Sequence, residues 1–414
     1  MRTTQMTRLL LSGVATLALA APAMALDAQA FVDRIAEVYK PLGYDFAFGA
    51  ATLNGDTVTV DGGTVTIVSS PDAAMEPMTF DTEVTFSGVT EHADGSYTAD
   101  SVTIPDIEAE FSSEHDAELR FSGIRVDGFY LPAGNPVPAT GLLQLVESFS
   151  TGPLSITRDG EEVFAFESMV SASTFSPAFA TPDLTDLATT FSINGIVADL
   201  TSVSEEDPET GATIEALGLT GLAGDVHMDM TWALADGRMA VNEFSFDFAD
   251  VAALDINLEV TGFTPDVLDQ IYAMQAAMSA GGEPTEEQAQ AQMMQGMALM
   301  QGVSIVSASV RYDDASLAGK LLDFFAAQSG ADRASFVQGL KAMLPSMLAG
   351  SGIPALNDLV VPPVSAFLDN PQSIEVKVAP PSPTSLLVLM AAAANPAGLI
   401  TALGLAVEAN QRAE

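Results

Sequence analysis

The side chains that most often carry chemistry are scarce in this chain. It has no cysteine and only three histidines, His92, His115 and His227. The lack of cysteine excludes disulfide bonds, thiol catalysis and cysteine-ligated zinc. No two histidines have the helical spacing of a zinc hydrolase motif, and each stands beside acidic residues or a turn. We therefore expect exposed histidines and no metal site.

Nucleophile motifs are equally scarce. The chain has no Gly-x-Ser-x-Gly elbow, no Ser-x-x-Lys pair and no glycine-rich phosphate loop. Its 55 acidic residues could supply two carboxylates for glycoside hydrolysis, but among so many acids a suggestive pair carries little information. A sugar groove also usually offers several aromatic platforms, and Trp232 is the only tryptophan. We expect no catalytic residue and no cofactor, and keep a carboxylate-based hydrolase as the third alternative.

The most informative spacing belongs to apolar residues. In the segment 241–248, Phe244, Phe246 and Phe248 alternate with acidic or polar residues. Because successive side chains of a β-strand point to opposite faces, the phenylalanines share one face and the polar residues the other. Residues 254–260 repeat this alternation. The apolar face must be covered by helices, by a second sheet or by a bound apolar ligand.

Methionines are concentrated in residues 265–301. Met293, Met297 and Met300 follow the i, i+4, i+7 spacing of one helix face. One interpretation is a flexible face that fills the core, and the other is an adaptable surface that meets a lipid, a peptide or a partner helix. The candidate ligand-binding residues are Phe244, Phe246, Phe248, Met293, Met297 and Met300.

The N-terminal segment predicts where the protein works. Arg2 and Arg8 flank the start of an apolar run, residues 9–20, and residues 23–25 have the small–x–small pattern that signal peptidase cuts. The apolar run is too short to span a membrane comfortably. We predict a signal peptide cut near Ala25 and a periplasmic location.

The chain is strongly acidic, with 55 acidic and 14 basic residues and a formal net charge of −41. Nucleic acid and anionic head groups would be repelled by most of such a surface, so we expect no nucleic-acid partner. The acids are scattered along the chain, which favours hydration of the surface in a salty medium over a cation site or a basic partner.

After the signal peptide over residues 1–25, residues 26–262 are predicted to be rich in strands. An amphipathic helix over 27–40 comes first, and a second short helix is expected over 141–149. Dipeptides that favour positive φ predict hairpin turns between strands. These dipeptides are Asn54-Gly55, Asp61-Gly62, Asp94-Gly95, Asp159-Gly160 and Asp236-Gly237.

Residues 263–414 are predicted to be mainly helical and to pack on the sheet. Helices are expected over 265–279, 284–301, 314–328 and 332–348, the first two broken at Gly281-Gly282, with strands over 304–312 and 373–378 and a proline-rich loop before the last strand. Strands followed by helices indicate an α+β fold. We predict a long, curved antiparallel sheet, a meander with Asp-Gly hairpins, covered by a mostly helical C-terminal part.

Residues 385–407 form an uncharged stretch long enough to span a membrane. Asn395-Pro396 divides it, and proline both removes a helical hydrogen bond and disfavours helix at the residue before it. Two short helices packed on the body fit better than one transmembrane helix. This segment is also the candidate surface for an envelope protein as partner.

Two segments resemble other proteins: residues 311–330, RYDDASLAGKLLDFFAAQSG, and residues 367–410, FLDNPQSIEVKVAPPSPTSLLVLMAAAANPAGLITALGLAVEAN. In these segments the chain is similar to an uncharacterised family of exported proteins from Gram-negative alphaproteobacteria. The resemblance implies a periplasmic protein and transfers no residue roles. The meandering strands also resemble, in architecture only, the extended β-groove proteins that contact lipids in Gram-negative envelopes.

The predicted function is non-catalytic. We expect the protein to bind or transfer an apolar envelope component such as a lipid, or to support an envelope assembly. The site would be a groove between the phenylalanine-rich strands and the methionine-rich helices. The main alternative is a purely structural or partner-binding module whose helices fill the apolar face of the sheet.

Overall fold

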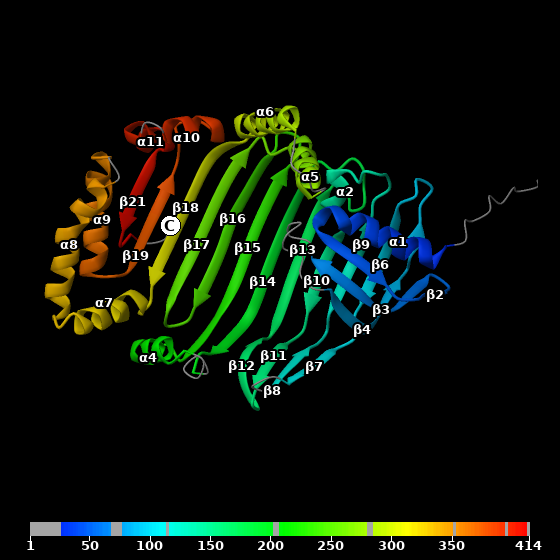
Figure 1. Cartoon of the computed structure of the whole chain (residues 1–414), viewed down its shortest axis with the longest axis horizontal. Coiled ribbons are helices and arrows are strands. Elements are labelled where there is room, and N and C mark those ends of the chain that lie inside the picture. Colours follow the sequence, from blue (N-terminus) through cyan, green and yellow to red (C-terminus); the bar gives the residue numbers. More distant parts are fainter. Residues whose placement is uncertain are drawn as a thin grey trace, which may run out of the picture.

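The computed structural model describes residues 26–67, 77–112, 116–201, 207–279, 285–350, 353–393 and 396–411. The predicted signal peptide, His115 and the Gly281-Gly282 break lie outside these ranges. Within them, 21 strands form one antiparallel sheet that does not close on itself, accompanied by ten α-helices (Figure 1). The predicted α+β fold is confirmed.

The strands are numbered in chain order, first those of residues 44–166 and then those of residues 168–409. The first set is β1 (Tyr44–Phe48), β2 (Ala51–Asn54), β3 (Thr57–Ile67), β4 (Met78–Ser87), β5 (Thr90–Glu91), β6 (Tyr97–Thr103), β7 (Ile107–Ser112), β8 (Asp116–Phe121), β9 (Arg125–Leu131), β10 (Val146–Thr151), β11 (Leu154–Arg158) and β12 (Glu161–Phe166). The second set is β13 (Ser168–Ser176), β14 (Asp186–Asp199), β15 (Gly221–Ala233), β16 (Arg238–Phe248), β17 (Ala252–Thr261), β18 (Ser304–Asp314), β19 (Ser373–Val378), β20 (Thr384–Ser385) and β21 (Leu405–Ala409).

The sheet branches at the long strand β14. The part of β14 from Asp186 to Asn194 pairs with β13, and Val197 and Ala198 pair with β12. One limb continues from β13 through β10, β9, β6 and β4 to β3, and the other from β12 through β11 and β8 to β7. On the other side of β14, the strands β15, β16, β17, β18, β19 and β21 follow in turn.

Four of the five predicted turns connect paired strands. They are Asn54-Gly55, Asp94-Gly95, Asp159-Gly160 and Asp236-Gly237. Asp159 and Gly160 have φ of +51° and +84°. Both values lie in the left-handed region, which the two central residues of a type I′ turn require.

The predicted turn at Asp61-Gly62 is wrong. Strand β3 continues through it, and the register against β4 shifts between Asp61 and Gly63. Gly62 has φ of +66°, and a Cβ there would lie 2.8 Å from the carbonyl oxygen of Phe80. Gly62 and Gly63 therefore belong to a β-bulge within a single long strand. The bulge bends the strand, whereas a hairpin turn would have ended it.

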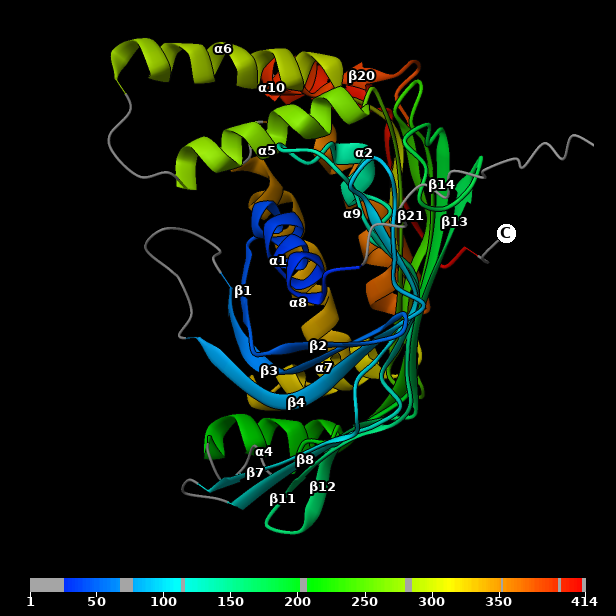
Figure 2. The ribbon, with the colours of Figure 1, turned by 90° about the vertical axis from the view of Figure 1, so that its right-hand side faces the viewer.

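The helices stand mainly on one side of the sheet. They are α1 (Ala28–Tyr39), α2 (Ala139–Leu142), α4 (Pro208–Leu217), α5 (Pro265–Ser279), α6 (Glu286–Gly302), α7 (Leu317–Gln328), α8 (Arg333–Ala349), α9 (Ala355–Asp369), α10 (Leu386–Ala393) and α11 (Pro396–Leu403). Figure 2 shows the sheet edge-on, strongly curved, with α1, α5, α8 and α9 on its concave side.

Helix α1 anchors the first limb of the sheet. Asp27 caps its N-terminus by accepting hydrogen bonds from backbone N–H groups of the first turn. Phe31 is fully buried, and its ring meets those of Phe86, Tyr97 and Phe129 edge-on, with centroids 5.1, 5.5 and 6.5 Å away. The predicted N-terminal helix is therefore part of the main core.

A second core lies between α5 and the strand ends beside it. Trp232 of β15 is buried and stacks on Phe263, and its indole N–H donates to the carbonyl oxygen of Phe263 at 2.9 Å. Leu268 and Tyr272 of α5 pack against this pair. The helix therefore covers the end of the sheet where β15 turns into β16.

The helix expected over residues 141–149 is mostly wrong. Helix α2 ends at Leu142, and the chain becomes β10 at Val146. Ser148 and Ser150 of β10 have partners on both β9 and β13. Hydrogen bonds to two neighbouring strands outweigh the weak helical pattern of this segment.

Helix α9 occupies the segment expected to be a proline-rich loop. Pro362 and Pro363 lie inside it, and each removes a backbone hydrogen bond. Tertiary packing offsets this loss, because α9 lies against α8 and β21. Its Phe367 also meets Tyr312 of β18 edge-on, with ring centroids 6.1 Å apart.

The segment 385–407 forms two short helices, α10 and α11, as predicted. In the part of the chain that the structure describes, no helix has both the length and the apolar character needed to cross a membrane. After α11 the chain returns as β21, which pairs with β19. The last residues of the segment, from Leu405 on, therefore belong to a strand and not to the second predicted helix.

Both predicted regions contribute strands to the same sheet. Strand β17 lies before the predicted boundary at 262/263, and β18 lies after it. The two strands pair from Ala252 opposite Asp314 to Thr261 opposite Ser304. The C-terminal region therefore supplies part of the sheet as well as the helices beside it.

Candidate functional site

One face of the sheet is apolar across both halves of the chain. Residues that face each other on successive strands form a row from β3 to β16 with one polar member, Ser171. The row is Val58, Phe86, Val102, Val126, Phe149, Ser171, Phe191, Met228 and Phe244. With strands about 4.8 Å apart, the row extends over about 40 Å.

Further along the sheet, Ile256, Val310, Val376 and Val407 face one another on β17, β18, β19 and β21. This is the concave face, because α1 packs on Phe86 and α9 on Tyr312. We call this apolar concave surface the groove, and its inward-facing strand residues the floor.

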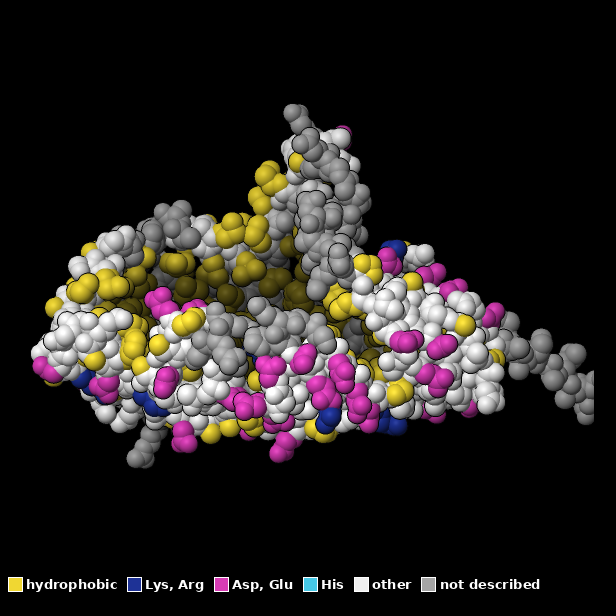
Figure 3. Space-filling model, turned by 60° about the horizontal axis from the view of Figure 1, so that its bottom comes forward, with side chains coloured by type: hydrophobic (Ala, Val, Ile, Leu, Met, Phe, Trp, Pro, Cys, Tyr) yellow, Lys and Arg dark blue, Asp and Glu magenta, His cyan; other side chains and the backbone are white. Residues whose placement is uncertain are grey.

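The floor is open to solvent near the edge of the sheet formed by the C-terminal strands. Val310 is 45% exposed and Val376 is 41% exposed, although both face the side on which the helices stand. Figure 3 shows a hollow in the molecule with hydrophobic groups over its walls. The helices therefore border the floor without covering all of it.

The predicted phenylalanines share the floor, as their alternation indicates. Phe244, Phe246 and Phe248 pack against a small buried cluster of neighbouring strands. Phe246 and Phe248 also line an apolar pocket of about 300 Å³ with Tyr312 and Leu317, where α7 begins. This pocket lies in the groove at one end of the strands.

The predicted methionines lie at the other end of the strands. Helix α6 leads into β18 at Ser304, whereas Phe248 stands beside the opposite end of β17. Ten residues of strand span about 33 Å. Met293 and Met297 are 60% and 40% exposed, and Met300 is half-buried. The two predicted sets thus border opposite ends of one groove and are not brought together.

Other exposed methionines on the concave side were not among the predicted site residues. Met343 and Met347 of α8 are 56% and 67% exposed, and Met390 of α10 is 57% exposed. The i, i+4 spacing of the first two is the signal that singled out the α6 methionines and could have found them.

A second apolar pocket, of about 370 Å³, lies beneath α1 on the same face. Ile35 and Tyr39 of α1 border it above, and Val102 and Val126 of the row lie among its lining residues. It was missed because its residues come from segments that are far apart in the chain.

The position of Tyr39 at this pocket predicts a pH effect. Burial, helped by the nearby Tyr44, raises the pKa of Tyr39 from 10.0 to about 12. Between these values the unfolded chain loses the phenol proton and the folded protein keeps it, so stability falls as pH rises. The wild-type protein should lose about 1.4 kcal/mol of unfolding free energy between pH 9 and pH 11 that the variant Tyr39→Phe does not lose. Urea unfolding of both proteins at the two pH values measures this difference. If the unfolding free energies of the two proteins changed equally with pH, the prediction would be refuted.

The convex face of the sheet is polar and charged. Arg311 donates to Asp313 at 2.6 Å and lies 3.5 Å from Glu375 on the next strand. Burial raises the pKa of Asp255, and Glu243 adds to the shift. The two faces of the same strands therefore differ sharply: carboxylates and guanidinium groups outside, hydrocarbon inside.

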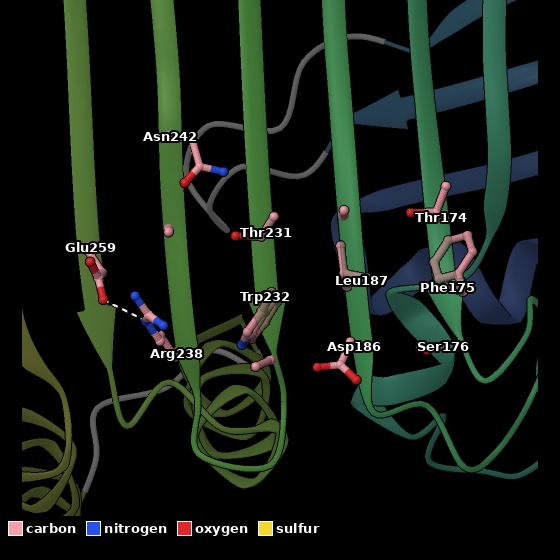
Figure 4. A pocket seen from close by; sticks show the side chains of 13 residues that line it. Thr174, Phe175, Ser176, Asp186, Leu187, Thr231, Trp232, Arg238, Asn242 and Glu259 are labelled. Atoms are coloured by element: carbon pink, nitrogen blue, oxygen red, sulfur yellow. Dashed lines mark hydrogen bonds and ion pairs between the residues drawn. The ribbon is translucent and has the colours of Figure 1, made fainter. Parts of the chain in front are cut away.

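A polar pocket of about 440 Å³ opens on the convex face near the start of β16 (Figure 4). Arg238 lines this pocket, and its guanidinium group donates a hydrogen bond to Glu259 at 2.6 Å. The carboxylate of Asp186 in the same pocket accepts from the hydroxyl of Thr185 at 2.7 Å. Because these charged groups already have partners, the pocket is better explained as surface structure than as a binding site.

The two described histidines lie apart from the groove. His92 lies 2.9 Å from the hydroxyl of Thr98, and His227 pairs across the convex face with Ser192 and Ser245. Among the residues that the structure describes, no three His, Asp or Glu side chains are placed to hold a metal ion.

Comparison with known proteins gives a family match for part of the chain. A family model described as "Uncharacterized protein" matches residues 245–410. The match includes both segments that carried the resemblance, 311–330 and 367–410, and spans β17 to β21 with the helices between them. No curated protein matches the chain.

Proposed function

We propose that this protein binds or transfers a lipid-like apolar ligand, whose hydrocarbon chains lie along the floor of the groove, and that it does so without catalysis. The observation that carries the proposal is the exposure of Val310 and Val376 on a concave apolar face. Isolated exposed valines are ordinary on a convex surface, but a continuous apolar surface inside a hollow favours a ligand.

The chemistry of the floor favours hydrocarbon over a polar guest. Ile256, Val310, Val376 and Val407 face one another across four strands, and none of these side chains has a hydrogen-bonding atom. The hydroxyl of Tyr312 is engaged, since it donates to Asp314 at 2.8 Å. A ligand would therefore gain mainly by burying apolar area, at about 25 cal/mol per Å².

The dimensions of the floor suit an elongated ligand. Along β17 it measures about 33 Å, and across the strands it continues toward the pocket beneath α1. Long acyl chains would fill such a surface, whereas a compact apolar molecule would cover only one of its pockets.

The place of action in this proposal is the periplasm. Support comes from the N-terminal pattern of Arg2, Arg8 and the apolar run 9–20. The resemblance to exported envelope proteins points the same way. In such a compartment, a carrier with a charged outer face and an apolar groove could hold a lipid in aqueous surroundings.

The experiment that tests the proposal is native mass spectrometry of protein purified without detergent. We expect lipid adducts on the intact protein and saturable uptake of a fluorescent fatty acid once the adducts are removed. Ligand-free protein that takes up no probe would show that the helices close the floor in solution. That result would favour the structural or partner-binding alternative.

A further inference from the structure

Helices α6 and α10 meet at one end of the sheet. Helix α6 ends at Gly302, immediately before β18 begins. The first residues of β18, Ser304 and Ile305, pair with β20, and the backbone N–H of Leu386 at the start of α10 donates to the carbonyl oxygen of Val303. Figure 1 shows both helices above the same strand ends, and they contact each other.

The two segments that meet here carry no charge. Residues 288–310 contain no Asp, Glu, Lys or Arg, and neither do residues 378–407. In the whole chain 17% of residues are charged and the net charge is −41. The fold therefore brings together two uncharged stretches, far apart in sequence, on an otherwise acidic protein.

Both helices expose large apolar side chains to solvent. Met293, Met294 and Met297 of α6 are 60%, 60% and 40% exposed. Val388 and Met390 of α10 are 52% and 57% exposed. We call these five residues the helical cap.

We propose that the helical cap docks on the electrically neutral surface of a lipid bilayer. Flexible methionine side chains can enter the boundary between head groups and acyl chains, where apolar area is buried. The cap holds no cation that would attract anionic lipid, and the acids elsewhere would be repelled by such lipid. The charge distribution therefore favours a zwitterionic bilayer over an anionic one as the partner of the helical cap.

The location of the cap connects docking with the groove. Ala308, Val378 and Leu405 are floor residues toward this end, and they face one another on β18, β19 and β21. A docked cap would place this end of the groove at the bilayer. This consequence rests on the proposed ligand binding, whereas docking itself is measured separately.

Flotation with vesicles tests the docking. The full-length mature protein is mixed with vesicles of phosphatidylcholine alone, or of phosphatidylcholine with phosphatidylglycerol, at low salt. We expect flotation with the neutral vesicles and weaker flotation with the anionic ones. The double variant M294Q/V388Q should bind neutral vesicles about tenfold more weakly or worse, because two apolar side chains lose their burial.

The matched control is the double variant M343Q/M347Q on α8. These methionines are as exposed as those of the cap, but α8 also carries Lys341, which forms an ion pair with Asp369 at 2.7 Å. We expect the control to float like wild type. Equal loss in both variants, or a wild-type protein that floats with neither vesicle, would overturn the proposal. So would stronger binding to the anionic vesicles.

Two further measurements keep the outcomes distinct. Circular dichroism and thermal unfolding show whether the cap variant remains folded. Uptake of the fluorescent fatty acid in solution, without vesicles, should be unchanged in the cap variant, because Met294 and Val388 lie on helices outside the floor. Cap-dependent flotation without probe uptake would support docking and refute the proposed ligand binding. Probe uptake without cap-dependent flotation would refute docking and leave the proposed ligand binding unaffected.

Discussion

Replacement of Val310 by aspartate is expected to abolish uptake of a fatty-acid probe while the protein stays folded. Val310 is an exposed residue of the floor and lies between Ile256 and Val376. A hydrocarbon chain laid over it would strip water from the new carboxylate, and burial of an unpaired ionised group costs several kcal/mol. We expect affinity to fall at least about 100-fold, measured by probe titration.

Val170→Asp is the matched control for this prediction. Val170 is 39% exposed on β13 and pairs with Ser150 and Ser192 on the convex face. Both substitutions remove a β-branched side chain from a strand, so each should lower stability by about 1 kcal/mol. Only Val310→Asp should lose the probe. Equal affinities of the two variants would show that the floor does not bind it.

Replacement of Phe31 by alanine is expected to be the most destabilising single change. Its ring is fully buried between α1 and the first limb of the sheet, in contact with Phe86, Tyr97 and Phe129. Removal of a buried phenylalanine side chain leaves a cavity and costs about 3–5 kcal/mol. Urea unfolding followed by circular dichroism measures the loss.

Phe111→Ala provides the comparison. Phe111 lies on the edge strand β7 and is 56% exposed, so its truncation should change stability by less than about 0.5 kcal/mol. A loss below about 1 kcal/mol for Phe31→Ala would mean that α1 is not docked on the sheet in solution.

The sequence was most informative where one residue type decides the local geometry. Alternation placed Phe244, Phe246 and Phe248 on a single face, because a strand has no other way to arrange them. Asp159-Gly160 and its counterparts marked turns because few dipeptides accept positive φ at both positions. At Asp61-Gly62 the same preference served a bulge, which local sequence does not distinguish from a turn.

The sequence was least informative where distant segments meet. The row from Val58 to Phe244 depends on the register of nine strands, and no single strand encodes its neighbours. Helix α9 tolerates two prolines because of what it packs against. For the same reason, the spacing of Met293, Met297 and Met300 indicated a helix face but not which end of the groove it borders.

Strands β14 to β18 pair strictly in chain order, each with the next. A sheet assembled in this way is modular: insertion of one more hairpin would widen it by about 10 Å without altering the pairing of strands beyond the insertion. Gene duplication of a hairpin could therefore change the span of this protein in steps. Homologues of different length are expected to differ by whole hairpins, with the terminal helices retained at the two margins.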